Sequence, residues 1–218
     1  MQFKIIDITT GISEKTPVYD GDPVPVFGKV SSISKDGFTV TRISIGTHTG
    51  THVDAPLHLY EDGKSVADID PKSLMGKAVL LDLSSGSGPI TDIELENAYE
   101  LYSGENADII LIKTDNCSSV CPAESPSSVR MLVASAGEWI FENGFKAVGV
   151  DTLSVDDDGS LPNHHLFLKN KINIVEYLNL KDVNPGVYFF ICLPLKLDGC
   201  DGAPSRAILM DIQSVNVL

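Results

Sequence analysis

The chain has 218 residues, of which 43% are apolar and 21% are charged, as is ordinary for a globular protein. A chain of this length is expected to fold as one domain, residues 1–218, around one sizeable core. Its net charge of −14 repels other anions, which excludes nucleic acid and anionic membranes as partners. Neutral or cationic partners, metal ions among them, are favoured instead.

No basic segment followed by a long apolar run opens the chain, so we expect no signal peptide. No apolar run reaches the roughly 18 residues that a membrane helix needs. The four cysteines, Cys117, Cys121, Cys192 and Cys200, fit no zinc-ribbon spacing. We interpret them as reduced thiols of a cytoplasmic protein. A metal-binding or redox pair at Cys117 and Cys121 stays open as the alternative.

Runs that are continuously apolar or rich in β-branched residues predict strands along the whole chain. In chain order these lie at residues 2–8, 38–46, 77–83, 108–113, 147–150, 172–178, 187–193 and 206–212.

Capping signals predict helices between several of these strands. They are a short helix opened by Asp70 and Pro71 and closed by Gly76, a helix from Asp92 to Leu101 opened by Thr91 and Glu94, and a helix opened by Ser135 and Glu138 and closed by Gly144. Strands alternating with a few helices predict a mixed α/β fold.

The segment HTGTHVDAPLH, residues 48–58, holds three of the five histidines of the chain. His48, His52, Asp54 and His58 all occupy even positions. In an extended chain, the side chains of every second residue point to one face. We therefore expect three imidazoles and a carboxylate to converge.

A helix is the alternative for this segment, because His48 and His52 have the i, i+4 spacing of zinc proteases. It is disfavoured, since Gly50 and Pro56 are poor helix residues and no Glu follows His48. Neutral imidazole and carboxylate suit zinc, manganese or iron(II). Three protein ligands with one open position are typical of a catalytic metal site. A polar strand end satisfied by hydrogen bonds is the purely structural explanation.

A second polar segment, residues 151–178, contains the other two histidines, His164 and His165. Glu176 interrupts an otherwise apolar run there, and a buried carboxylate is costly unless it is paired or bound to a metal. A metal ligand and a solvent-facing residue on an edge strand are both open for Glu176. The three consecutive aspartates at 156–158 are interpreted as a solvated turn.

The segment HTGTHVDAPLH matches, at every specified position, the signature HxGTHxDxPxH of the cyclase family of metal-dependent hydrolases. That family includes bacterial kynurenine formamidases and isatin hydrolases. Residues 17–23, 149–156, 164–176 and 201–207 are also similar to family motifs, and the likeness thins only between about 60 and 145. The resemblance implies the swivelling β/β/α fold, an α/β single mixed domain, and assembly as a homodimer or homotetramer.

Carried over residue by residue, the resemblance implies that His48, His52 and Asp54 hold a first metal ion. Asp54 and Glu176 bridge to a second ion where two are present, and His164 completes the second site. The implied metal is Zn²⁺, with Mn²⁺ as the alternative, at one or two ions per subunit.

The same resemblance assigns His58 as the general acid/base and leaves His165 as a neighbour of the ligand. The N-terminal motif of kynurenine formamidases reads PVWPGD and supplies a tryptophan to the substrate pocket. Tyr19 stands in its place here and can stack on an aromatic substrate. For Arg206, binding of a substrate carboxylate is possible, but an ion pair with a structural carboxylate is the favoured interpretation.

The activity that this resemblance implies is hydrolysis of a carbon–nitrogen bond in a small aromatic amide. An arylformamidase, which converts N-formylkynurenine to kynurenine and formate, is the first hypothesis. A hydrolase of cyclic amides or lactones, of the isatin hydrolase type, is the second. A non-catalytic metal-binding protein is the third, and it is disfavoured because metal storage needs no additional imidazole such as His58.

Overall fold

The computed structural model of the chain describes residues 4–114, 129–156 and 159–211. Within these residues the chain forms strands and α-helices in an α/β order, together with short 3-10 turns. They are β1 (Lys4–Asp7), β2 (Val26–Ser31), α1 (Ile33–Asp36), β3 (Val40–Ser44), β4 (His52–Asp54), β5 (Met75–Asp82), α2 (Asp92–Tyr99), β6 (Ile109–Lys113), α3 (Ala134–Glu142), β7 (Ala147–Val150), α4 (Pro162–Lys169), β8 (Asn173–Glu176), β9 (Gly186–Pro194) and β10 (Gly202–Asp211).

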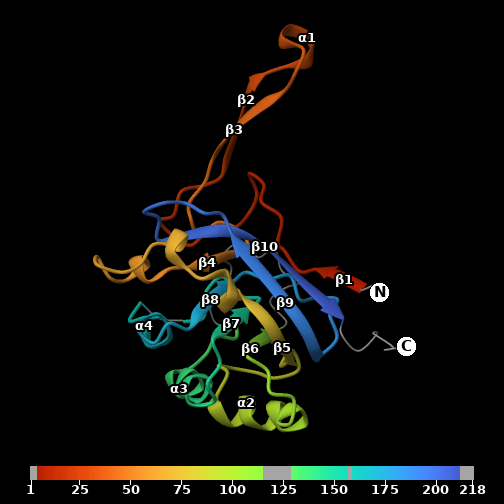
Figure 1. Cartoon of the computed structure of the whole chain (residues 1–218), viewed down its shortest axis with the longest axis vertical. Coiled ribbons are helices and arrows are strands. Elements are labelled where there is room, and N and C mark those ends of the chain that lie inside the picture. Colours follow the sequence, from red (N-terminus) through yellow and green to blue (C-terminus); the bar gives the residue numbers. More distant parts are fainter. Residues whose placement is uncertain (1–3, 115–128, 157–158, 212–218) are drawn as a thin grey trace.

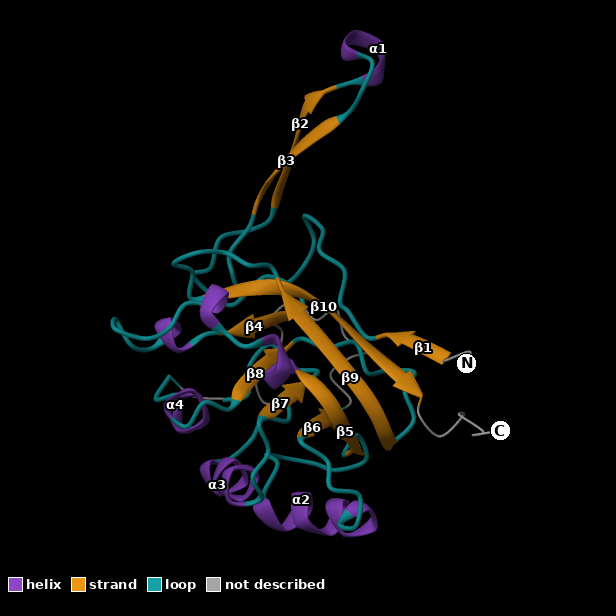
Figure 2. Ribbon diagram, viewed as in Figure 1, coloured by secondary structure: helices purple, strands orange, loops and turns teal. Residues whose placement is uncertain are grey.

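Seven strands close into a barrel-like sheet in the order β10-β4-β8-β7-β6-β5-β9, because β9 also pairs with β10. The neighbours among β5, β6, β7 and β8 run parallel, and the other pairs of the ring are antiparallel. Strand β1 pairs with the far end of β10 (Figure 2). The expected mixed α/β architecture is therefore confirmed.

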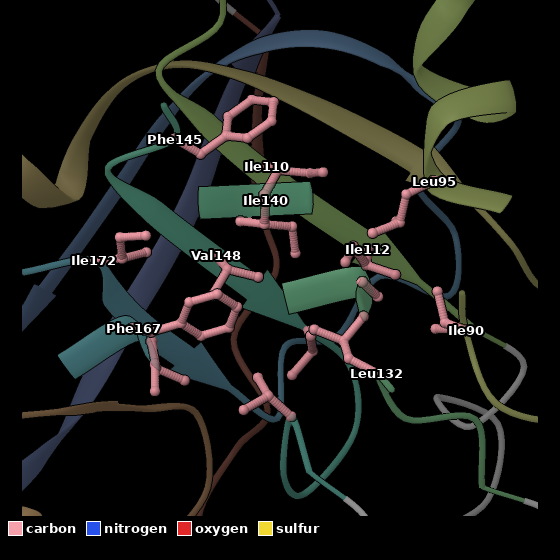
Figure 3. Close-up of a cluster of buried hydrophobic side chains, with 14 of the residues drawn as sticks. Ile90, Leu95, Ile110, Ile112, Leu132, Ile140, Phe145, Val148, Phe167 and Ile172 are labelled. Atoms are coloured by element: carbon pink, nitrogen blue, oxygen red, sulfur yellow. The ribbon is translucent and has the colours of Figure 1, made fainter. Parts of the chain in front are cut away.

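The barrel has an apolar interior and an apolar outer layer. The interior is filled by buried side chains such as Val53, Leu80, Leu111, Val175 and Phe190. On the outer face, α2, α3 and α4 pack against the parallel strands. Figure 3 shows this layer, in which the helix residues Leu95, Ile140 and Phe167 meet the strand residues Ile110, Ile112 and Val148. Because both faces are covered, β6 and β7 read as continuous apolar runs rather than alternating ones.

A two-stranded hairpin extends away from the barrel along the long axis of the molecule (Figure 1). It consists of β2 and β3, which pair with each other in a separate two-stranded sheet, and of the single-turn helix α1 at its tip. Every residue of β3 is exposed to solvent.

The eight predicted strands are all present, but two predictions at helix ends were wrong. The helix near residue 135 begins at Ala134, so Ser135 does not cap it and instead donates a hydrogen bond to Asp92 at 2.6 Å. The element after Asp70 is a 3-10 turn that ends at Leu74, and Gly76 already lies in β5. The predicted helix from Asp92 is confirmed as α2.

No helix in the described part of the chain has the length and apolarity that crossing a membrane requires.

Candidate metal centre

Three polar side chains of the centre come from the neighbouring strands β4 and β8. In their antiparallel pairing, His52 lies directly opposite Glu176, so the two side chains point to the same face. Asp54 shares that face because it follows His52 by two residues. The intervening Val53 and its partner Val175 point into the barrel interior. The polar cluster therefore lies on the outer face of the barrel.

The turn that leads into β4 is fixed by Gly50 and Thr51. Gly50 has φ 67°, and a Cβ atom there would lie 2.7 Å from the side chain of Ile12, so a side chain is excluded. The Thr51 hydroxyl donates to the carbonyl of Tyr177 at 2.6 Å and accepts from the amide of Thr10 at 2.8 Å. These bonds tie the turn to the end of β8, next to Glu176.

His48 reaches the cluster from this turn. Its Nδ1 lies 2.9 Å from Oδ1 of Asp54, and its Nε2 lies 2.9 Å from Oδ2 of Asp201. The other carboxylate oxygen of Asp201 accepts from the hydroxyl of Thr47 at 2.9 Å. Gly202 makes room for this arrangement, since a Cβ there would lie 3.0 Å from the ring of His48.

His164 enters from the first turn of α4 and is buried. Its Nδ1 lies 2.7 Å from Oδ2 of Asp156, which also accepts the backbone N–H of His164 at 2.9 Å. Asp156 further accepts the backbone N–H of Asn163 at 3.0 Å. One carboxylate therefore satisfies the start of α4 and leaves Nε2 of His164 directed at the cluster.

The ligand-type atoms of the buried cluster have nearly uniform spacing. Nε2 of His52 lies 3.4 Å from Oδ1 of Asp54 and 3.3 Å from Oε2 of Glu176. Nε2 of His164 lies 3.4 Å from Oδ2 of Asp54 and 3.4 Å from Oε1 of Glu176. Two ligands of a tetrahedral zinc ion, each about 2.0–2.1 Å from the metal, are themselves roughly 3.3 Å apart. The spacing therefore fits metal binding.

Oxygen Oδ2 of Asp54 is a second indication that the cluster suits a metal ion. It is buried and makes no hydrogen bond to any residue in the described part of the chain. A buried carboxylate oxygen without a hydrogen bond is costly, and a metal ion would satisfy it. With imidazoles and carboxylates as donors, the residues present suit zinc or manganese.

Two overlapping groups meet the distance requirement for shared ligation. The ligand atoms of His52, Asp54 and Glu176 lie within 4.8 Å of one another, and so do those of His48, Asp54 and His58. The structure thus brings a ring nitrogen of His58 within 4.8 Å of the Asp54 carboxylate, although His58 was predicted as an acid/base group.

His58 lies at the rim of the cluster, in the 3-10 turn Pro56–His58, with 29% of its side chain exposed. Its ring centroid is 4.2 Å from that of His48 and 6.0 Å from that of His164. Nδ1 of His58 lies 3.6 Å from Oδ2 of Asp201. Burial lowers the pKa of His58, so its imidazole is neutral near pH 7 and keeps a lone pair that can accept a proton.

The structure separates the other candidate residues from the cluster. Tyr19 is 53% exposed, and its side chain has no hydrogen-bond or ring partner among the described residues. His165 is exposed, and its ring contacts Tyr60 instead. Arg206 forms an ion pair with Asp7, which confirms the structural interpretation.

Sequence reasoning missed the carboxylates that support the cluster. The interpretation of 156–158 as a solvated turn was wrong for Asp156, which is 2% exposed and holds His164. The feature that could have indicated this role is the position of Asp156 shortly before α4, which begins with Pro162. Asp201 is the first residue of the segment 201–207, which resembles a family motif, but no role was predicted for it. Cys192 and Cys200 are free thiols, as expected, whereas Cys117 and Cys121 lie outside the described residues.

Comparisons with known sequences identify relatives along almost the whole chain. The "Cyclase" family model matches residues 6–157. A kynurenine formamidase from Bacillus mycoides (strain KBAB4) is 34% identical over 210 residues, which cover 95% of this chain and 97% of the relative. A kynurenine formamidase from Salinibacter ruber (strain DSM 13855 / M31) is 35% identical over 212 residues, with coverage of 95% and 97%.

Solved structures share the fold. A predicted metal-dependent hydrolase from Bacillus stearothermophilus superposes with a TM-score of 0.80 at 30% identity, over 97% of this chain and 100% of that one. Isatin hydrolase A from Ralstonia solanacearum gives a TM-score of 0.83 at 24% identity, over 95% and 92% of the two chains. The second likeness concerns the fold alone.

The barrel with its buried imidazole and carboxylate cluster, taken with these relatives, places the protein among the hydrolases as an enzyme. The chain belongs to the cyclase family, as its residues 48–58 indicated.

Proposed function

We propose that this enzyme is a metal-dependent arylformamidase that hydrolyses N-formylkynurenine to kynurenine and formate. The observation that carries the proposal is a neutral imidazole, His58, at the exposed rim of a buried cluster suited to a metal ion. Such a pairing serves hydrolysis, because bond cleavage needs both an electrophilic centre and a group that transfers protons. The named relatives supply the substrate class.

The proposed ligands of a first metal ion are His48, His52 and Asp54. Asp54 and Glu176 would bridge to a second ion, and His164 would complete that second site. Zinc is the proposed metal, with manganese as the alternative. A bound ion supplies Lewis-acid activation of the formyl carbonyl and of water.

The proposed role of His58 is to move one proton during each turnover. The Asp201 carboxylate, 3.6 Å from Nδ1, favours a proton on that nitrogen and leaves the lone pair on Nε2. Nε2 takes a proton from the water that adds to the formyl carbon. The carbon–nitrogen bond then breaks as Nε2 returns the proton to the leaving nitrogen, which gives the free aromatic amine and formic acid, and the acid then ionises to formate.

A cyclic-amide or lactone hydrolase of the isatin hydrolase type is the second candidate. It needs the same cluster and the same proton transfer, and it differs only in the shape of the substrate pocket. Tyr19 is proposed to contact an aromatic substrate in either case. Its exposed position is compatible with this role, because such a side chain is free to close over a ring.

The deciding experiment uses metal-free protein that is reloaded in parallel with Zn²⁺ and with Mn²⁺. Hydrolysis of N-formylkynurenine is followed by absorbance and compared with hydrolysis of isatin. Turnover of about 1–10³ s⁻¹ on the formamide is expected. A fully loaded protein that turns over isatin alone would favour the second candidate. One that turns over neither substrate would leave only a metal-binding role.

The variant His58→Ala tests the role of the rim imidazole. We expect kcat to fall by about 10²–10⁴-fold with the metal content unchanged, since only the proton transfer is removed. His165→Ala is the matched control and should keep full activity. Loss of metal together with activity in His58→Ala would make His58 a ligand, as its distance to Asp54 allows.

The proposal also places the enzyme in the cytoplasm, acting on small molecules as a homo-oligomer. A chain with reduced thiols at Cys192 and Cys200 is suited to that compartment.

A further inference from the structure

Asn163, in the first turn of α4, is completely buried. Its amide nitrogen Nδ2 donates to Oδ1 of Asp156 at 2.7 Å and to the backbone carbonyl of Leu132 at 3.0 Å. Its carbonyl oxygen Oδ1 is buried and has no hydrogen-bond partner among the residues that the structure describes, which is unfavourable. An apolar side chain of similar size would avoid that penalty, so the two donated bonds point to a role for the carboxamide.

Helix α3 leaves room for this carboxamide at Gly137. The helices α3 and α4 pack against each other (Figure 1). A Cβ atom at Gly137 would lie 1.9 Å from Oδ1 of Asn163, so any other residue would push the carboxamide out of place. A glycine inside a helix is also less favourable than alanine. The fold therefore tolerates both a weak helix residue and an unpaired oxygen around one side chain.

The first donated bond fixes the orientation of Asp156. Its Oδ1 accepts from Nδ2 and from the backbone N–H of Asn163, whereas its Oδ2 accepts from the backbone N–H of His164 and contacts the ring at Nδ1. Because Nδ2 of Asn163 holds one carboxylate oxygen, the other stays 2.7 Å from Nδ1 of His164. The opposite nitrogen of that ring, Nε2, then points to Asp54 and Glu176.

The second donated bond leads to Glu176 through the backbone. The carbonyl of Leu132 accepts from Asn163, and the N–H of Leu132 donates to the carbonyl of Val155 at 3.1 Å. The N–H of Val155 in turn donates to Oε1 of Glu176 at 2.8 Å. One buried carboxamide is therefore connected by hydrogen bonds to both His164 and Glu176.

The other proposed ligands have supports of their own. Nδ1 of His52 donates to the carbonyl of Gly50 at 2.8 Å, and Nε2 of His48 lies 2.9 Å from Oδ2 of Asp201. These supports belong to the turn before β4 and to the connection before β10, and not to α4. Loss of the Asn163 carboxamide should therefore disturb one part of the cluster and leave this part in place.

We propose that Asn163 is a positioning residue for the second of the two metal ions assigned above. Its carboxamide holds His164 and Glu176 in the arrangement that this ion needs, and so determines how tightly the ion binds. The inference rests on the metal ligands of the proposed function and not on its substrate. Zinc binding and turnover are measured separately, so failure of one proposal is distinguishable from failure of the other.

The variant Asn163→Leu removes the amide donors and keeps nearly the same volume. Binding of Zn²⁺ to the metal-free protein is measured by competition with a coloured chelator. Two ions are expected per wild-type subunit, and in Asn163→Leu the second should bind about tenfold more weakly while the affinity for the first is unchanged. Asn170→Leu, at the exposed C-terminal end of α4, is the matched control and should bind both ions as the wild type does.

The variant Gly137→Ala separates positioning from stability. Its methyl group displaces the carboxamide of Asn163 from a neighbouring helix, whereas alanine itself favours a helix. A general loss of stability would weaken the binding of both ions, but a displaced carboxamide should weaken that of the second ion alone. This variant decides the question if Asn163→Leu does not fold.

Cadmium NMR of the cadmium-loaded protein gives a spectroscopic test, because each signal reports the ligand geometry around one ion. Two signals are expected, and His164→Ala identifies the one that belongs to the second ion. In Asn163→Leu and in Gly137→Ala, that signal alone should move. A wild-type chain that binds a single ion overturns the proposal. So does a second ion whose affinity and signal are unchanged in both variants, or an equal weakening of the two ions.

Discussion

The imidazoles around Asp54 differ in the charge that their surroundings favour. Burial acts to lower the pKa of His52, but ion pairs with Asp54 and Glu176 outweigh it and raise that pKa to about 10. Burial also acts to lower the pKa of His164, but its carboxylate partners, of which Asp156 is the strongest, raise that pKa to about 12. At His58 burial prevails and lowers the pKa. In the metal-free protein, His52 and His164 are therefore cations, whereas His58 is neutral.

These pKa values predict that metal binding releases protons. A metal ligand must be a neutral imidazole, so an ion that binds His52 and His164 displaces their protons. At pH 7 we expect at least two protons to be released per fully loaded subunit, since Asp54 and Asp201 also raise the pKa of His48, and the affinity for zinc should rise as the pH increases from about 6 to 9. Calorimetric titration in buffers of different ionisation enthalpy measures the release.

The control for this measurement is His165→Ala, which removes an imidazole outside the cluster and should release the same number of protons. An affinity for zinc that does not change over this pH range would contradict the raised pKa values.

Single residues were predictable where the side chain itself takes part in the cluster. His48, His52, Asp54 and His58 converge as the sequence indicated, but only residues 52–54 are extended, and turns bring the two outer histidines inward. For the supporting carboxylate Asp156, the sequence offered only its position ahead of the Pro-led start of α4. Its contact with His164 depends on how α4 folds back, and local spacing does not reveal that.

At the scale of elements, helix α4 serves to deliver one side chain to the cluster. Asp156 accepts the N–H groups of Asn163 and His164 and also contacts the ring of His164, so it fixes both the helix start and the imidazole. The residue before the helix, Leu161, adopts φ 50°, a left-handed conformation that costs about 1–3 kcal/mol. The hydrogen bonds of Asp156 to the start of α4 offset the strain at Leu161.

The variant Asp156→Asn should weaken metal binding without unfolding the protein. Asparagine keeps the shape and one acceptor oxygen but loses the charge that makes His164 a strong ligand, so we expect about 10–100-fold lower affinity for zinc. Competition with a coloured chelator measures this. Asp82→Asn, at an ion pair with Lys113, is the control. Equal affinities in the two variants would mean that His164 needs no support from Asp156.

Continuous apolar strands and a capped helix were predicted well, whereas β2 and α4 were not predicted. The buried strands β5, β6 and β7 are continuous apolar runs, and Thr91 caps α2 as its spacing indicated. Strand β2 contains Gly28 and Lys29 without a regular apolar pattern, so it gave no signal, and β4 covers only three residues of the extended segment expected at residues 48–58. Their pairing partners, which lie elsewhere in the sequence, determine that they are strands.

For the whole molecule, the cluster joins β4, β8, α4 and the turn at His48, so a bound ion links parts that are distant in the sequence. A ligand that binds only the folded form stabilises it by about 2.7 kcal/mol at a hundred times its Kd. For a chain of this size we expect zinc to raise Tm by roughly 5–10 °C over the chelated protein. Differential scanning calorimetry measures the shift.

Magnesium at the same concentration is the control, because it prefers oxygen ligands and should bind the imidazoles poorly. Equal values of Tm with zinc, with magnesium and with chelator would show that the cluster does not hold a metal ion in the folded protein.

The pairing of His52 with Glu176 and of Val53 with Val175 also bears on how the barrel assembles. A slip of β4 by one residue would turn Val53 toward the cluster and bury His52 and Asp54 in the apolar interior. A misaligned strand would thus be unable to chelate. Metal binding by a newly made chain would stabilise only the correct register of β4 on β8. The ion would therefore favour the native strand pairing during folding, before it took part in catalysis.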